Sequence, residues 1–146
     1  MAGASENFIG TWRMRSWVIR DDQGRETQPL GPDATGLLTY TADGYMFAAL
    51  MAPGRKRHAI DDPMGGTPDE AQASMASYHT YCGRYRLEGA GVIVHAVEMS
   101  ALPNMVGTEQ RRFYRFADAR LVLTTPPMIR KGSAGVAELV WERVTA

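Results

Sequence analysis

Hydrophobic and polar residues alternate with a period of two along most of the chain, which is typical of half-buried β-strands. Strand-like segments cover residues 10–20, 36–41, 45–52, 83–87, 92–100, 108–116, 120–125 and 135–144. Turn residues separate them, and Asp43-Gly44 is a strong hairpin signal because both residues tolerate a positive φ. About eight short strands joined by turns predict an all-β fold, a closed antiparallel barrel with room for one small ligand.

The first strand divides its residues between two faces. One face is predicted to carry Trp12, Met14, Ser16 and Val18, and the other Arg13, Arg15 and Trp17. An exposed Trp17 beside Arg15 would be a weak indication of a homodimer surface.

One segment changes to a helical period. Thr67 is a suitable N-cap, Pro68 suits the first helical position, and the acids at 69 and 70 favour the helix dipole. A stripe of Ala71, Met75 and Tyr78 extends the predicted helix over residues 68–81. The preceding residues 53–67 show no period and are expected to form a lid or a mobile loop.

The two ends of the chain predict how the barrel is closed. Gly10-Thr11-Trp12 begins the first strand, and Arg143 lies near the end of the last. The Trp12 indole can cover the barrel floor, and the guanidinium can lie on it as a cation–π partner. A closed floor implies an open top and therefore a cavity.

Composition narrows the function classes. The 146 residues fit a single domain spanning residues 1–146 and carry 16 basic and 16 acidic side chains. Zero net charge argues against nucleic-acid or membrane partners, and no apolar run is long enough to span a bilayer. One cysteine, Cys82, and an N-terminus without signal-peptide character predict a cytoplasmic protein.

No sequence motif predicts a metal or a cofactor. The three histidines fall in a predicted loop, helix and strand, so no local spacing makes a metal site. The chain has neither a dinucleotide-binding nor a phosphate-binding glycine loop. We therefore expect no bound metal and no cofactor.

His95 is the first candidate for chemistry. It lies in an apolar strand, Val92–Ser100, and an inward imidazole could act as an acid or base near neutral pH. The competing interpretation is a structural histidine that is hydrogen-bonded to a neighbour. The strand is too uniformly apolar to decide whether His95 or Glu98 faces inward.

Gln110 and Arg112 are the second candidate. In the strand at 108–116 they share a face with Tyr114 and Phe116, and this face carries the greater apolar bulk. A buried Arg112 requires a partner, which could be a ligand oxyanion or an internal acid such as Glu98.

Aromatic side chains at strand ends are the remaining candidates. An inward tyrosine lines an apolar cavity and offers one hydrogen bond, although ordinary barrel packing explains many such residues. The predicted lining residues of this kind are Tyr40, Tyr45, Phe47, Tyr81 and Tyr85. His79, on the predicted helix, could point over the mouth or simply lie on a solvated face.

The chain resembles the lipocalin-like domain family, small relatives of the lipocalins found in bacteria and fungi. The motifs that carry the resemblance are Gly10-Thr11-Trp12-Arg13, Tyr40-Thr41-Ala42-Asp43-Gly44-Tyr45-Met46, Gly107-Thr108-Glu109-Gln110 and Trp141-Glu142-Arg143. The resemblance implies a calycin-type barrel with a helix packed against or across one opening. It does not imply one reaction, since such barrels include carriers as well as cofactor-free cyclases and isomerases.

Three functions therefore stay open. The barrel could bind a small, mostly apolar metabolite and isomerise or cyclise it without a cofactor, with Arg112 and Tyr85 holding an oxyanion and His95 moving a proton. It could equally be a non-catalytic carrier of such a molecule. A filled structural barrel is the third possibility.

Overall fold

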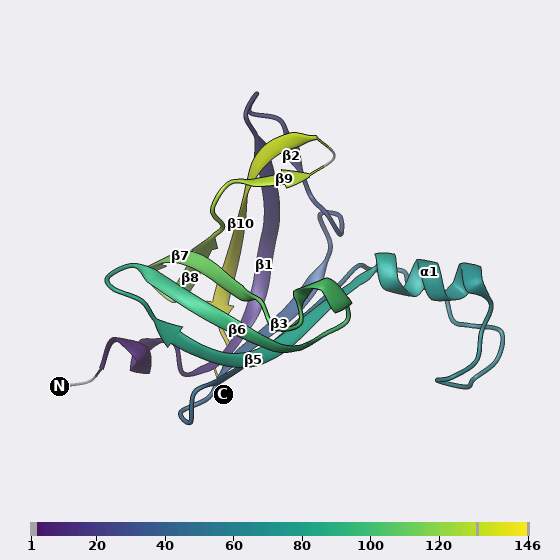
Figure 1. Ribbon diagram of the computed structural model, residues 1–146, viewed down its shortest axis with the longest axis horizontal. Helices are drawn as coiled ribbons and strands as arrows, with labels where there is room; N and C mark the ends of the chain where they lie inside the picture. The colour runs from purple at the N-terminus through teal and green to yellow at the C-terminus, as the bar shows by residue number, and fades with distance from the viewer. Residues whose placement is uncertain (1–2, 131, 146) are drawn as a thin grey trace.

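Eight antiparallel strands close into a barrel in the computed structural model, which describes residues 3–130 and 132–145 (Figure 1). These strands are β1 (Gly10–Asp21), β3 (Thr35–Tyr40), β4 (Tyr45–Met51), β5 (Tyr78–Leu87), β6 (Val92–Ser100), β7 (Glu109–Ala117), β8 (Arg120–Thr124) and β10 (Ser133–Arg143). β1 pairs with both β3 and β10, which closes the ring. The short strands β2 (Glu26–Thr27) and β9 (Met128–Arg130) extend β1 and β10 beyond it. The predicted eight-stranded barrel is confirmed.

The floor of the barrel is closed by residues from both ends of the chain. The Arg143 guanidinium lies 4.2 Å from the ring centre of Trp12 and donates hydrogen bonds to the carbonyls of Asn7 and Ile9. Gly10 has a φ of 129°, and a Cβ there would lie 2.9 Å from the Arg143 side chain. Glycine is therefore required where the chain enters β1.

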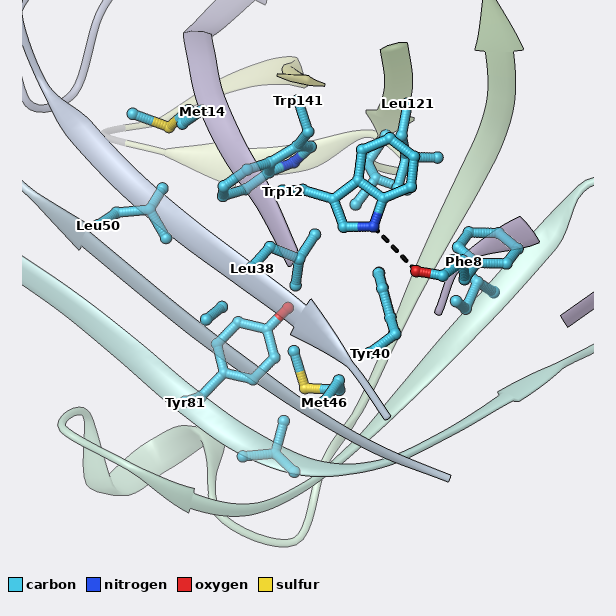
Figure 2. Close-up of a cluster of buried hydrophobic side chains, with 14 residues drawn as sticks. Phe8, Trp12, Met14, Leu38, Tyr40, Met46, Leu50, Tyr81, Leu121 and Trp141 are labelled. Carbon is cyan, nitrogen blue, oxygen red and sulfur yellow. Dashed lines mark hydrogen bonds between the residues drawn. The ribbon is translucent and has the colours of Figure 1, made fainter. Parts of the chain in front are cut away.

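Phe8 fills the centre of this floor, and the sequence patterns did not single it out. It follows the short 3₁₀ helix η1 (Ala4–Asn7), is 0% exposed, and makes edge-to-face contacts with Tyr40, Tyr114 and Phe116. Its carbonyl accepts a hydrogen bond of 2.9 Å from the Trp12 indole (Figure 2). The lower half of the barrel is therefore solidly packed.

A β-bulge in β1 changes which residues face inward. The pairing with β10 shifts between Met14 and Ser16, so the alternation reverses beyond this point. Trp17 faces the interior, and Arg15 forms an ion pair of 3.1 Å with Glu142 on the outside. The prediction of an exposed Trp17 is wrong. The indication of a homodimer surface rested on that exposure and therefore no longer holds.

The helix is shorter than predicted. α1 spans Pro68–Ala76 and has the expected capping box, in which the Thr67 hydroxyl accepts from the Glu70 N–H. The predicted end near Tyr81 is wrong because β5 already begins at Tyr78, which pairs with Met51 of β4. β4 thus pairs with β5 along the full length of β4, and this pairing outweighs the helical period.

The helix also lies elsewhere than the resemblance implied. α1 and the loop before it extend away from the barrel at the ends of β4 and β5 (Figure 1). The helix has no buried residue, and Met75, from its predicted apolar stripe, is 42% exposed. It therefore does not cover an opening of the barrel.

Candidate functional site

The upper half of the barrel contains a cavity of about 380 Å³. Its wall is mainly apolar and is formed by Trp17, Leu38, Ala48, Leu50, Leu123, Ala137, Leu139 and Trp141. The rim consists of Leu102 and Met105, from the β6–β7 connection, and of Met128 and Ile129, from β9. The polar lining residues are His79, Tyr81, His95, Gln110, Arg112 and Thr125. A volume of this size suits one small organic molecule.

His95 of β6 is the central polar residue of the site. Ile93, His95 and Val97 point inward and are almost fully buried, whereas Glu98 is exposed, which decides the register that the sequence left open. Because the pairing of β5 with β6 shifts at Gly83, Met99 points outward beyond this position. A Cβ at Gly83 would lie 1.9 Å from the Ala96 carbonyl oxygen, so only glycine permits this close approach.

Two tyrosines hold both ring nitrogens of His95. The Tyr40 hydroxyl lies 2.8 Å from Nε2, and the Tyr81 hydroxyl lies 2.7 Å from Nδ1. Burial and then the nearby Arg112 charge lower the pKa of His95 to about 3. Burial also raises the pKa of both tyrosines above the usual range. The three side chains therefore form a neutral hydrogen-bonded chain at neutral pH.

Arg112 brings a positive charge to the cavity wall. Its guanidinium donates to the Arg111 carbonyl at 2.8 Å and to Gln110 Oε1 at 3.4 Å. None of the ion pairs among the described residues involves Arg112, and the partner considered from sequence, Glu98, faces outward. The cavity thus contains a cation without a carboxylate partner.

The other aromatic candidates lie outside the cavity. Tyr40 is buried behind His95, and Tyr85 packs against Tyr40 and donates to the Thr41 carbonyl at 2.8 Å. Tyr45 stacks with Arg84, whose guanidinium lies 4.6 Å from the ring centre. Phe47 is 52% exposed on the outer face of β4, so the expectation that it faces inward is wrong.

Sequence patterns missed several lining residues for identifiable reasons. Trp17 reaches the cavity only because of the bulge in β1, and a bulge leaves no signal in an alternating pattern. His79 belongs to β5 rather than to the helix, and its ring contacts those of Trp17 and Tyr81 at centre distances of 5.8 and 5.7 Å. The rim residues Leu102 and Met105 lie in a connection without a period, and Met128 and Ile129 lie in the short strand β9.

Among the described residues, no group of three His, Cys, Asp or Glu side chains is placed to hold a metal ion. In the same part of the chain, no helix is long and apolar enough to cross a membrane. What the cavity wall offers is apolar surface, one cation and several hydrogen-bond donors.

Comparison with known proteins places this geometry in a family. The model of a lipocalin-like domain matches residues 9–144. A 4′-hydroxy-3′-methoxypropiophenone carrier protein of Aspergillus oryzae is 30% identical over 107 residues, which are 68% of this chain and 96% of that protein. The structure of a lipocalin-like protein from Bacteroides uniformis aligns with a TM-score of 0.47 and 13% identity, over 94% of this chain and 99% of the other. Because the family model extends from the start of β1 to the end of β10, the chain belongs to the lipocalin-like domain family.

Proposed function

We propose that this protein is a carrier that binds one small, mostly apolar metabolite with an oxygen function in the barrel cavity. The observation that carries the proposal is the cavity itself, an apolar space of about 380 Å³ with its polar groups gathered around His95. The packed floor places the opening at the other end, where the rim residues Leu102 and Ile129 are 40% and 78% exposed. A ligand of one or two rings would fit this volume.

The family relative supports a carrier of an aromatic compound. Its printed name describes a carrier of a hydroxylated and methoxylated aryl ketone. A molecule of this class has a flat apolar ring for the wall of leucines and tryptophans, and oxygen atoms for the polar groups. We therefore propose aromatic ketones and similar phenolic metabolites as the ligand class.

The surroundings of His95 favour a carrier over an isomerase or cyclase. A general base near neutral pH needs a free nitrogen and a pKa near the working pH. His95 has both nitrogens in hydrogen bonds, and burial and the Arg112 charge hold its pKa at about 3. The proton-transfer role considered from sequence is therefore not part of the proposal.

The proposal is tested by titrating the protein with 4′-hydroxy-3′-methoxypropiophenone and measuring tryptophan fluorescence and, by calorimetry, the heat of binding. Because Trp17 and Trp141 line the cavity, we expect saturable 1:1 binding with a change in emission. The ligand should be recovered chemically unchanged after long incubation. Conversion of the compound into a product would show that the protein is an enzyme rather than a carrier. If neither this compound nor related aryl ketones bind, the proposal is contradicted.

A pair of neighbouring substitutions shows whether binding takes place in the cavity. Ala48 lines the cavity, whereas Ala49 is on the opposite face of the same strand. Ala48→Phe is expected to abolish binding by filling space, and Ala49→Phe to leave it unchanged. Equal affinity of both folded variants for the ligand would show that the ligand binds outside the cavity.

A further inference from the structure

The Tyr40–His95–Tyr81 chain has a consequence for ligand choice. We propose that these hydrogen bonds orient the Tyr81 hydroxyl as a donor to the ligand, and that the cavity selects molecules with a carbonyl oxygen. The inference rests on the proposed function, because it concerns the same cavity and specifies the ligand group that it recognises. Tyr81 would contact the ligand, whereas Tyr40 and His95 would be positioning residues.

The proton of the Tyr40 hydroxyl has one acceptor within reach in the described part of the chain, His95 Nε2. This hydroxyl is 1% exposed, and His95 Nε2 is its one hydrogen-bond partner among the described residues. If Nε2 carried a proton and donated it to Tyr40, the Tyr40 O–H would be buried without an acceptor. An unsatisfied buried donor costs about 1–3 kcal/mol. The Tyr40 hydroxyl therefore donates its proton to a bare Nε2.

The direction of the Tyr40 hydrogen bond determines which nitrogen of the neutral His95 ring carries the proton. One ring nitrogen carries the proton and the other accepts. With Nε2 as the acceptor, Nδ1 carries the proton and donates it to the Tyr81 oxygen, 2.7 Å away. The Tyr81 hydroxyl keeps its own proton for another partner, and Tyr81 lines the cavity.

The other polar groups of the cavity point to the same ligand chemistry. Arg112 adds further donors, and no Asp or Glu among the described residues belongs to the lining. The oxygen of Gln110 already accepts from Arg112. A cavity with such an excess of donors favours a ligand with acceptor oxygens over one whose polar groups are donors.

The ligand preference can be measured with compounds that differ in one group. The probes are 2-acetylnaphthalene and 2-ethylnaphthalene, which have the same rings and nearly the same shape. Calorimetric titration is expected to show roughly tenfold tighter binding of the ketone, the effect of about one net hydrogen bond. Equal affinities for the two compounds would overturn the inference and leave the proposed carrier function intact. Failure of both to bind would count against the carrier function as well.

Tyr81→Phe tests the proposed donor directly. This variant loses one hydroxyl and is expected to bind the two probes with similar affinity, while its affinity for 2-ethylnaphthalene stays at the wild-type value. Tyr85→Phe is the matched control, since its hydroxyl is bonded to a backbone carbonyl and Tyr85 does not line the cavity. It should keep the tenfold preference. A preserved preference in Tyr81→Phe would overturn the inference.

A measurement on the wild-type protein reports the protonation of the His95 ring directly. The ¹⁵N chemical shifts of the His95 ring distinguish a protonated from a bare nitrogen, and His95→Gln identifies the signals by their loss. We expect a protonated Nδ1 and a bare Nε2 at pH 7. A protonated Nε2 with a bare Nδ1 would mean that Tyr81 donates to His95, and would overturn the inference.

Discussion

At the scale of single residues, His95 shows how surroundings determine chemistry. A histidine in an apolar strand is compatible with a catalytic base or with a buried structural group. The hydrogen bonds from Tyr40 and Tyr81, together with full burial, favour the neutral form. The sequence placed this histidine in an apolar strand but left open whether it faces inward. Its two partners come from β3 and β5 and were not predictable from the sequence.

This environment makes the free energy of unfolding depend on pH. The pKa of His95 is about 3 in the folded protein and about 6.5 in an unfolded chain. Below pH 6.5 the unfolded state therefore binds more protons, and stability falls as pH decreases towards 3. Between pH 7 and pH 5 we expect a loss of roughly 2 kcal/mol from this residue.

Urea unfolding at both pH values checks this prediction. His95→Gln, which cannot titrate, should lose about 2 kcal/mol less than the wild type over this interval. His58→Gln is a suitable control because His58 lies in the loop before α1, outside the barrel. An identical pH dependence in wild type and His95→Gln would contradict a neutral buried His95.

At the scale of elements, local signals and long-range pairing decide different boundaries. The Asp43-Gly44 turn and the start of α1 lie where their residues predict, because a positive φ at Gly44 and the Thr67 cap are local requirements. The end of α1 and the inward face of β1 depend on distant strands, namely β4 and β10. The elements were therefore predictable in kind and at their local boundaries only.

The helix is expected to be energetically separate from the barrel. Thr67→Ala removes the capping box and should destabilise α1 by about 1 kcal/mol. Because α1 has no buried residue, we expect faster amide exchange confined to residues 68–76, with the melting temperature and ligand affinity unchanged. Gln72→Ala, an exposed change within the same helix, should leave exchange as it is. A clear drop in melting temperature for Thr67→Ala would show that the helix supports the barrel.

At the scale of the whole molecule, the barrel has a packed floor and a hollow upper half. Trp12, Trp141, Tyr40 and Phe8 are the largest fully buried side chains, and all four belong to the continuous core. Ion pairs on the outer surface, such as Arg86–Glu109 and Arg111–Glu88, contribute little to stability because they are exposed to solvent. The packed floor and the cavity wall therefore share one continuous core, and Trp141 belongs to this core while lining the cavity.

Two phenylalanines test this division. Phe8→Ala removes a side chain that is 0% exposed and should lower the free energy of unfolding by about 3–5 kcal/mol. Phe47→Ala removes one that is 52% exposed on the outer face and should change it by less than about 1 kcal/mol. Chemical denaturation measures both. Similar losses would mean that the floor is not the centre of the core.

The sequence by itself determined the barrel strands, the hairpin turn and the helix start, because alternation, caps and turn residues act over a few positions. The Trp12–Arg143 closure was predictable from the motifs at the two ends of the chain. It also pointed to His95, Gln110 and Arg112, which do line the cavity. Only the tertiary structure decided where the cavity lies and which tyrosine lines it. Those features depend on two bulges and on contacts between strands far apart in the chain, and neither leaves a periodic trace.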